Sequence, residues 1–447
     1  MRLRRRLPSF AHPRRVRAAC IVAAALATAA GGFGATPSAP APRRWGGRPS
    51  ADELTALGRA IFNDPGLSAS GRMACATCHD PAAGFGPNAQ TPSPFSDGVA
   101  AHAGTRAIPS LRYVQYTPRF TEHLIQDEEE GPGEDEGPTG GLTWDGRADT
   151  AHEQALLPLF ADNEMANTDA AGLARKLASA RYAAQFRKAV SAPGRNVFDD
   201  PRLVVDWLAY ALEVYEQSKE FRPFDSKYDR ALAGKANLTP QEVRGLRLYE
   251  NKTKGNCETC HPATRTVAGA APIMTDNGLV AVAAPRRPGL PPIAASSAAL
   301  AYPQSATAHG AEVDLGLCRS GRPGLTDDPG FCGRFRTPTL RNVAVRTTFF
   351  HNGSMHSLRD VVAFYATRDT DPGRWYSKNA DGSVHLYDDV PPEMVASVDH
   401  EVPFDPLPDG TPRLNDRDID DIVAFLETLT DADLLPAAAK APAVAKK

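Results

Sequence analysis

Two copies of one short motif constrain this chain more than any other feature of its sequence. The pattern Cys-x-x-Cys-His occurs at residues 75–79 ("CATCH") and again at residues 257–261 ("CETCH"). Each copy places two thiols three positions apart with an imidazole directly behind the second. Whatever group these side chains hold, the chain holds it twice, so we expect two similar units in tandem.

Three kinds of site use paired cysteines at this spacing. A redox-active pair needs a thioredoxin-like βαβ context, and neither copy follows an apolar strand pattern. A structural zinc site would use four thiolates but gives no role to the histidine behind both pairs. Covalent c-type haem explains every residue, because each cysteine forms a thioether and the next histidine ligates iron. The expected attachment residues are Cys75, Cys78, Cys257 and Cys260, and the expected iron ligands are His79 and His261.

The first residues have the pattern of an export signal. A strongly basic segment, "MRLRRRLPSFAHPRRVR", precedes an apolar run of small residues that is too short and too glycine-interrupted to be a bilayer anchor. We expect residues 1–35 to be a signal peptide, cleaved between Ala27 and Ala35, and the mature protein to be periplasmic. Lipidation of Cys20 and an uncleaved anchor are the alternatives.

The net charge of the chain and its low-complexity segments limit the classes of partner that it could bind. The formal net charge of -3 provides no overall basic field for nucleic acid, and no other run is apolar enough to span a membrane. The acidic run at residues 127–138 reads as a solvated loop, with a contact to a basic partner as the alternative. Residues 433–447 are expected to form a disordered tail.

Two further cysteines flank a loop with turn signals. Cys318 and Cys332 enclose "RSGRPGLTDDPGF", which is rich in Gly, Pro and Asp. In an oxidising compartment a disulfide that closes this loop is the expected state. Two buried thiols are the alternative.

The segments around the two motifs repeat one helical plan. Capping boxes at Ser50–Glu53 and Thr239–Glu242 each begin a run of helically spaced apolar residues that ends in a glycine-containing loop before the motif. Further helices are expected at residues 201–218 and 415–430. Strand-like alternation is scarce. The sequence therefore predicts an all-α fold with two c-type cytochrome domains and long loops.

The domain boundaries follow from these helices. We expect an N-terminal cytochrome domain over residues 48–225 and a C-terminal one over residues 236–432, which meet near residues 222–238. Each domain would carry one covalent haem.

One segment contains polar and aromatic residues that a simple electron carrier would not need. Residues 142–168 contain Trp144, Gln154 and Glu164 in a run of helical character. Near a haem, the indole could relay electrons, the amide could orient peroxide, and the carboxylate could move a proton between its oxygens. The plain alternatives are a core tryptophan, a helix cap and a surface carboxylate.

Together with the paired motifs, "WDGRA" and "FRTPTLRNVAVRTTFFHNGSMHSLRDVVAFY" make the chain resemble the bacterial di-haem cytochrome c peroxidases. That superfamily includes the methylamine-utilisation di-haem enzyme, which builds a tryptophylquinone inside a partner protein. The resemblance covers residues 48–430. It implies that Trp144 is the inter-haem tryptophan and that Gln154 and Glu164 are the distal pair over the N-terminal haem.

The resemblance also suggests candidates for the sixth iron ligands. His102 lies where the family has a loop histidine that caps the N-terminal haem in the oxidised enzyme. For the C-terminal haem, the family's methionine position falls on Tyr365, as in the cofactor-building enzyme. Met355 and Met394 are the alternatives. The tryptophan that precedes the second motif in that enzyme is Gly255 here.

A calcium ion between the domains is a further candidate cofactor. The family places an asparagine near this ion, and Ala107 stands at that position, which argues against calcium. The backbone carbonyls of Thr337 and Thr339 could still contribute.

Three functions fit these features. The first is a peroxidase that reduces hydrogen peroxide at the N-terminal haem with electrons from a small cytochrome c or copper protein. The second is long-range oxidation of a partner protein, which Tyr365 favours. The third is a di-haem electron carrier, which would leave Gln154 and Glu164 without a role. A homodimer is a candidate assembly.

Overall fold

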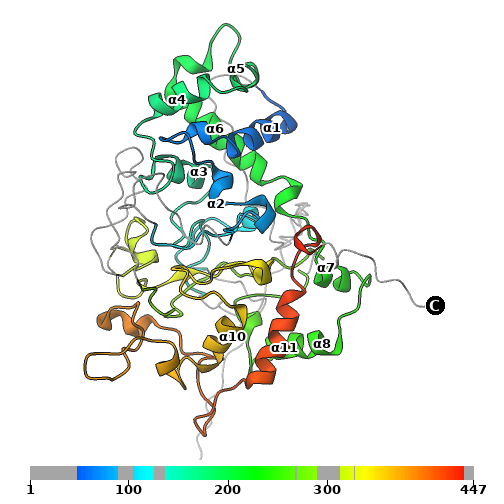
Figure 1. Ribbon diagram of the computed structural model, residues 1–447, viewed down its shortest axis with the longest axis vertical. Coiled ribbons are helices and arrows are strands. Elements are labelled where there is room, and N and C mark those ends of the chain that lie inside the picture. Colours follow the sequence, from blue (N-terminus) through cyan, green and yellow to red (C-terminus); the bar gives the residue numbers. More distant parts are fainter. Residues whose placement is uncertain are drawn as a thin grey trace, which may run out of the picture.

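The computed structural model describes residues 48–88, 104–124, 136–266, 269–288, 313–326 and 328–436. The predicted signal peptide, His102 and most of the acidic run lie outside them. The described chain forms two mainly helical halves stacked along the long axis of the molecule (Figure 1). Buried hydrophobic residues collect in two large clusters, one between Leu54 and Phe221 and the other between Tyr228 and Leu429.

The N-terminal half is built around a long buried helix. Its helices are α1 (Ala51–Phe62), α2 (Cys75–Cys78), α3 (Ala151–Phe160), α4 (Ala170–Ala178), α5 (Ala183–Val190) and α6 (Pro201–Glu216). The predicted capping box starts α1, where Ser50 Oγ accepts a hydrogen bond from the Glu53 amide at 3.2 Å. Helix α6 begins after Asp200, whose side chain accepts hydrogen bonds from the amides of Arg202 and Leu203.

The C-terminal half repeats this arrangement. Its helices are α7 (Lys227–Leu232), α8 (Pro240–Glu250), α10 (Leu358–Thr367) and α11 (Asp416–Glu427). The second predicted capping box starts α8, where Thr239 Oγ1 accepts from the Glu242 amide at 3.3 Å. Helix α7 lies in the interval between the two predicted domains, and its Tyr228 packs in the C-terminal core.

Glycine allows one close helix crossing in each half. A Cβ atom at Gly58 in α1 would lie 2.0 Å from the carbonyl oxygen of Ala211 in α6. A Cβ atom at Gly245 in α8 would lie 1.9 Å from the carbonyl oxygen of Asp421 in α11. Neither crossing leaves room for a side chain, so each pair of helices packs backbone to backbone.

Irregular chain joins the halves, and the C-terminal half contains a short sheet. Strands β1 (Leu279–Val280) and β2 (Phe335–Arg336) pair antiparallel, with Leu279 opposite Arg336. The Gly140 amide donates to the carbonyl oxygen of Asn277 at 2.9 Å, which ties an N-terminal loop to the C-terminal half. The fold is therefore mostly helical, as the sequence predicts, with this small sheet in addition.

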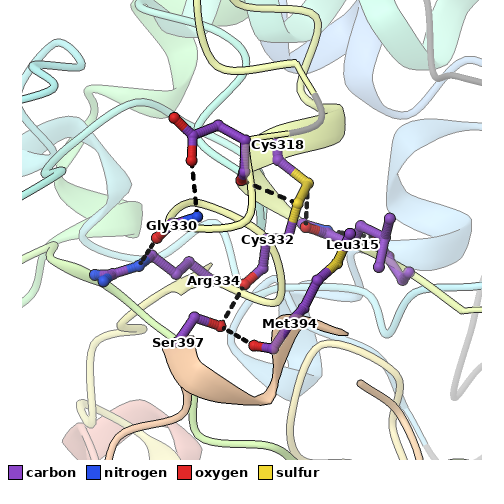
Figure 2. Close-up of a disulfide and its surroundings, with 10 residues drawn as sticks. Leu315, Cys318, Gly330, Cys332, Arg334, Met394 and Ser397 are labelled. Atoms are coloured by element: carbon purple, nitrogen blue, oxygen red, sulfur yellow. Dashed lines mark hydrogen bonds between the residues drawn. A yellow bond between two sulfur atoms is a disulfide. The ribbon is translucent and has the colours of Figure 1, made fainter. Parts of the chain in front are cut away.

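The predicted disulfide is present. The sulfur atoms of Cys318 and Cys332 are 2.07 Å apart, and both residues are buried (Figure 2). Ser397 Oγ donates to the carbonyl oxygen of Cys332 at 2.9 Å, and Met394 packs against the pair. In the described part of the chain, no helix is both long enough and apolar enough to span a lipid bilayer.

Candidate functional site

The first Cys-x-x-Cys-His motif forms a single helical turn that presents an imidazole. Cys75 and Cys78 bound α2, and the His79 amide donates to the carbonyl oxygen of Cys75 at 2.9 Å. His79 Nδ1 lies 3.1 Å from the carbonyl oxygen of Phe85. Because that bond takes the Nδ1 proton, Nε2 keeps its lone pair for a metal.

The second motif has the same local geometry. The His261 amide donates to the carbonyl oxygen of Cys257 at 2.9 Å, and Nδ1 lies 3.0 Å from the carbonyl oxygen of Met274. Burial lowers the pKa of both His79 and His261 to about 4, so both imidazoles are neutral at pH 7. A neutral ring oriented by a backbone carbonyl is the ligating form of histidine.

The four motif thiols argue against a redox-active pair and against a zinc site. Their sulfur atoms are not paired in disulfides, and burial raises the pKa of each thiol to about 12. A redox-active pair needs a lowered thiol pKa, which is the opposite shift. Among the described residues, no three His, Cys, Asp or Glu side chains gather as metal ligands, whereas a structural zinc site would bring four together. The arrangement fits two c-type haems.

A buried arginine that the sequence analysis did not single out supports this fit. The Arg346 guanidinium is buried, which lowers its pKa to about 10, and its Nε has no hydrogen-bond partner among the described residues. Arg346 lies close enough to His261 for its charge to lower the pKa of that imidazole. A haem propionate would supply the missing acceptor. Arg346 belongs to the stretch "RNVAVRTTFF". Nothing in that stretch marks it as a site residue, and only its position in the fold does so.

Glu164 lies beside the thiols of the first motif. It occupies the turn after α3, where its amide donates to the carbonyl oxygen of Ala161 at 3.0 Å. Its charge raises the pKa of Cys75 and Cys78, which places the carboxyl near both sulfur atoms. Burial raises the pKa of Glu164 to about 7, against the lowering effect of Arg147. Gln154 lies on α3, ten residues earlier.

Trp144 does not lie in a helix, and this part of the expectation is wrong. The structure places it in a turn between the bridge partners Leu142 and Ala148. Its Nε1 donates to the carbonyl oxygen of Ala107 at 2.7 Å, and its own carbonyl accepts from the Arg336 amide at 2.7 Å. Trp144 therefore contacts both halves of the molecule.

An ion-pair network surrounds this turn, and no pattern in the sequence marks it. Asp145 is fully buried and accepts from Arg147 Nε at 2.9 Å, while Arg106 Nη1 lies 2.8 Å from its Oδ2. Burial would raise the pKa of Asp145, but the two arginines hold it far below its usual range. Arg147 thus joins this network to Glu164, on whose pKa it acts. Asp145 and Arg147 both belong to the stretch "WDGRA" that carries part of the family resemblance.

Tyr365 lies near the second pair of thiols. It is on α10, and its ring stacks on Phe404 at a centroid distance of 5.0 Å. Burial, followed by the charges of Cys260 and Cys257, raises the pKa of its phenol. The structure therefore places Tyr365 beside the C-terminal attachment site.

The other sixth-ligand candidates differ in position. Met355 is buried in the C-terminal core, and Met394 packs against the disulfide. His102 lies outside the described residues.

The carbonyls considered for calcium already accept hydrogen bonds. The Thr337 carbonyl accepts from Thr275 Oγ1 at 2.7 Å, and the Thr339 carbonyl accepts from Arg346 Nη2 at 3.0 Å. At the position of the family's asparagine, Ala107 uses its carbonyl for Trp144.

Comparison with known proteins assigns the family. The family model described as di-haem cytochrome c peroxidase matches residues 52–237. The methylamine utilization protein MauG of Paracoccus denitrificans (strain Pd 1222) is 34% identical over 396 residues, which cover 86% of this chain and 90% of MauG. The protein belongs to the di-haem cytochrome c peroxidase family. This confirms the resemblance noted from the motifs, and membership implies two haem c groups.

Cytochrome c peroxidases of this family are also similar to the chain. Cytochrome-c peroxidase IdrP1 of Denitromonas iodatirespirans is 27% identical over 422 residues, covering 90% of this chain and 97% of IdrP1. The crystal structure of the diheme peroxidase BthA from Burkholderia thailandensis E264 matches with a TM-score of 0.70 and 38% identity, covering 92% of this chain and 94% of BthA. The family therefore supports an oxidoreductase, with peroxidases and MauG proteins both among the relatives.

Proposed function

We propose that this family member is a periplasmic peroxidase that reduces hydrogen peroxide to two water molecules. Two electrons would come from a small cytochrome c or copper protein. The observation that carries the proposal is the position of Glu164 beside Cys75 and Cys78. Because the pKa of this buried carboxyl is raised to about 7, it can accept and return a proton near neutral pH.

The N-terminal site would perform the chemistry. Haem iron, when bound, would supply the redox equivalents for this reaction. Cys75 and Cys78 would hold the group, and His79 Nε2 would ligate its iron. Glu164 would take one proton from peroxide and deliver it to the departing oxygen, while Gln154 orients both oxygens by hydrogen bonding.

The C-terminal site would receive electrons. Cys257 and Cys260 would attach the second haem, and His261 would ligate its iron. Tyr365 is the proposed sixth ligand, supported by its position beside these thiols, with Met355 as the alternative. Trp144 would relay electrons between the two sites, since it contacts both halves. His102 is the proposed cap of the N-terminal iron in the oxidised enzyme.

Long-range oxidation of a partner protein is the second candidate. It is favoured by the 34% identity to MauG and by the position of Tyr365, because an anionic oxygen ligand stabilises oxidised iron. This function would use the same two sites, but electrons would pass from the partner protein to the two sites as the partner is oxidised. A holoprotein that consumes peroxide only when a partner protein is present to be oxidised would favour this candidate.

The decisive experiment replaces the proposed proton carrier. Glu164→Gln keeps the shape of the side chain but removes its acidic proton, so peroxide turnover should fall by about 10²–10⁴-fold. Haem content and the spectra of both haems should stay unchanged. Glu427→Gln, at an exposed position at the end of α11, is the matched control and should keep the normal rate. A Glu164→Gln protein with normal turnover would reject the proposed mechanism.

A further inference from the structure

An aromatic cluster leads from the C-terminal attachment site toward the protein surface. Tyr365 lies close enough to Cys257 and Cys260 for their charges to act on its phenol. Its neighbour Phe364 is fully buried, and the two rings meet edge to face with centroids 6.0 Å apart. The ring of Trp375 meets Phe364 on the outer side at 5.7 Å, again edge to face. Three packed rings therefore connect the site with Trp375.

Trp375 is partly exposed and firmly held. Its Nε1 donates to Thr367 Oγ1 at 3.0 Å, and that hydroxyl donates to the carbonyl oxygen of Ala363 at 2.7 Å. The Arg374 guanidinium lies over the indole, 4.2 Å from the ring centroid. These contacts fix an electron-rich ring at the surface, at the outer end of the cluster.

The surface beside Trp375 is apolar in part and carries little net charge. The His385 amide donates to the carbonyl oxygen of Ser377 at 2.8 Å, which closes a hairpin. Trp375 precedes this pair by two residues, and Leu386 follows it by one. Leu386 is 48% exposed and is the one large hydrophobic side chain classed as exposed among the described residues. The exposed charged residues here are Asp371, Arg374, Lys378 and Asp381, and Arg374 also lies 3.4 Å from Asp360, whose side chain is 49% exposed.

Two positive and three negative side chains leave a net charge of only about -1, so this surface gives little long-range attraction to a charged partner. Aromatic and aliphatic residues with a polar rim are typical of contact surfaces between proteins. The complementary occupant is a small redox protein with an uncharged, apolar contact face. The proposed function requires such an electron donor, and the inference below rests on that function.

We propose that Trp375 is the docking and electron-entry point for this donor. The reduced donor loses one electron, which crosses the Trp375, Phe364 and Tyr365 rings and reduces the C-terminal site by one electron. No bond is made or broken, and no proton moves. Two such transfers supply one peroxide.

The test measures electron entry without peroxide. Oxidised holoprotein is mixed anaerobically with a reduced small blue-copper protein that has an apolar, near-neutral contact face, and reduction of the C-terminal haem is followed by its absorbance. Trp375→Leu should lower the rate at saturating donor by about tenfold or more, equivalent to about 1.4 kcal/mol in the barrier. The dissociation constant of the zinc-substituted donor should rise by about tenfold or more as well. Both effects should depend weakly on salt.

A matched control comes from the N-terminal half. Phe198 is also partly exposed under an arginine, with the Arg187 guanidinium 5.2 Å from its ring centroid. Phe198→Leu should leave both the rate and the dissociation constant unchanged. Hexaammineruthenium(II), a small reductant that needs no docking surface, should reduce every variant at the wild-type rate.

Trp375→Phe preserves ring packing on Phe364 and separates loss of the indole from damage to the fold. It should also slow the protein donor. The proposal would be overturned if either Trp375 variant kept native haem spectra and was reduced at the wild-type rate at saturating donor. Electron entry would then lie elsewhere. Failure of the proposed peroxidase function would be seen differently, as absence of peroxide turnover with hexaammineruthenium(II) in the wild-type protein.

Discussion

Arg106 and Asp314 form a bidentate ion pair that joins the two halves of the molecule. Arg106 Nε lies 2.5 Å from Oδ2 of Asp314, and Nη2 lies 2.8 Å from Oδ1. The same guanidinium contacts Asp145, the residue after Trp144. The pair therefore holds the turn that carries Trp144 against the C-terminal half.

Asp314→Asn should destabilise the protein. The substitution leaves the charge of Arg106 with Asp145 alone and removes charge-assisted hydrogen bonds from a buried position, so the free energy of unfolding should fall by about 1.5–3 kcal/mol. Chemical denaturation of the holoprotein measures the change. Asp420→Asn breaks an ion pair whose carboxylate is 53% exposed and should cost less than about 1 kcal/mol. Equal effects of the two substitutions would contradict this role for the Arg106–Asp314 pair.

Peroxide turnover should depend on pH through Glu164. Burial raises the pKa of this carboxyl to about 7, so the proton-accepting carboxylate predominates only above that pH. We expect kcat/KM for peroxide to fall as the pH drops below about 7 and to level off above it. The pH-rate profile should lose this limb in Glu164→Gln. A wild-type profile that stays flat between pH 5 and about 8 would disagree with the assignment.

Tyr365→Phe should change the C-terminal haem selectively. Loss of the phenol oxygen removes the proposed sixth ligand, so the spectrum should change spin state and the reduction potential should rise. Electronic spectra and a redox titration measure both effects. Met355→Leu is the control, because Met355 is the competing candidate. If only the methionine variant shifts the spectrum, the ligand is Met355.

Two haems should be attached covalently, one at each motif. Denaturing mass spectrometry of the processed protein should find the mass of two haem groups added to the chain. Replacing Cys257 and Cys260 with Ser should leave one haem, bound at residues 75–79. Loss of both haems, or no change in mass, would contradict independent attachment.

Cys318→Ser should lower stability without changing either haem. The disulfide closes a loop with a sequence separation of 14 residues, for which the loss of a cross-link costs about 3 kcal/mol. Thermal unfolding of the oxidised and reduced protein measures this difference, with reduced wild type as the control. A variant that unfolds like the wild type would show that the bridge contributes no stability.

Local chemistry explains what the sequence determined. The two motifs predict their attachment chemistry because the cysteines and histidine that bind one haem lie within five residues of each other. The capping boxes at Ser50 and Thr239 predict helix starts because each links groups only three residues apart. The disulfide follows from two cysteines and the turn-rich loop between them.

Only the tertiary structure decided the features made by long-range contacts. Trp144 lies in a turn because Thr143 takes a positive φ of 72° and the chain folds back through the Leu142–Ala148 bridge, which helical spacing could not reveal. In the sequence, nothing distinguishes Arg346 from the other arginines. Its burial near His261 in the fold makes it a candidate partner for a haem propionate. The sequence specifies each group's chemistry, but the distances between groups far apart in the chain depend on how the two halves pack.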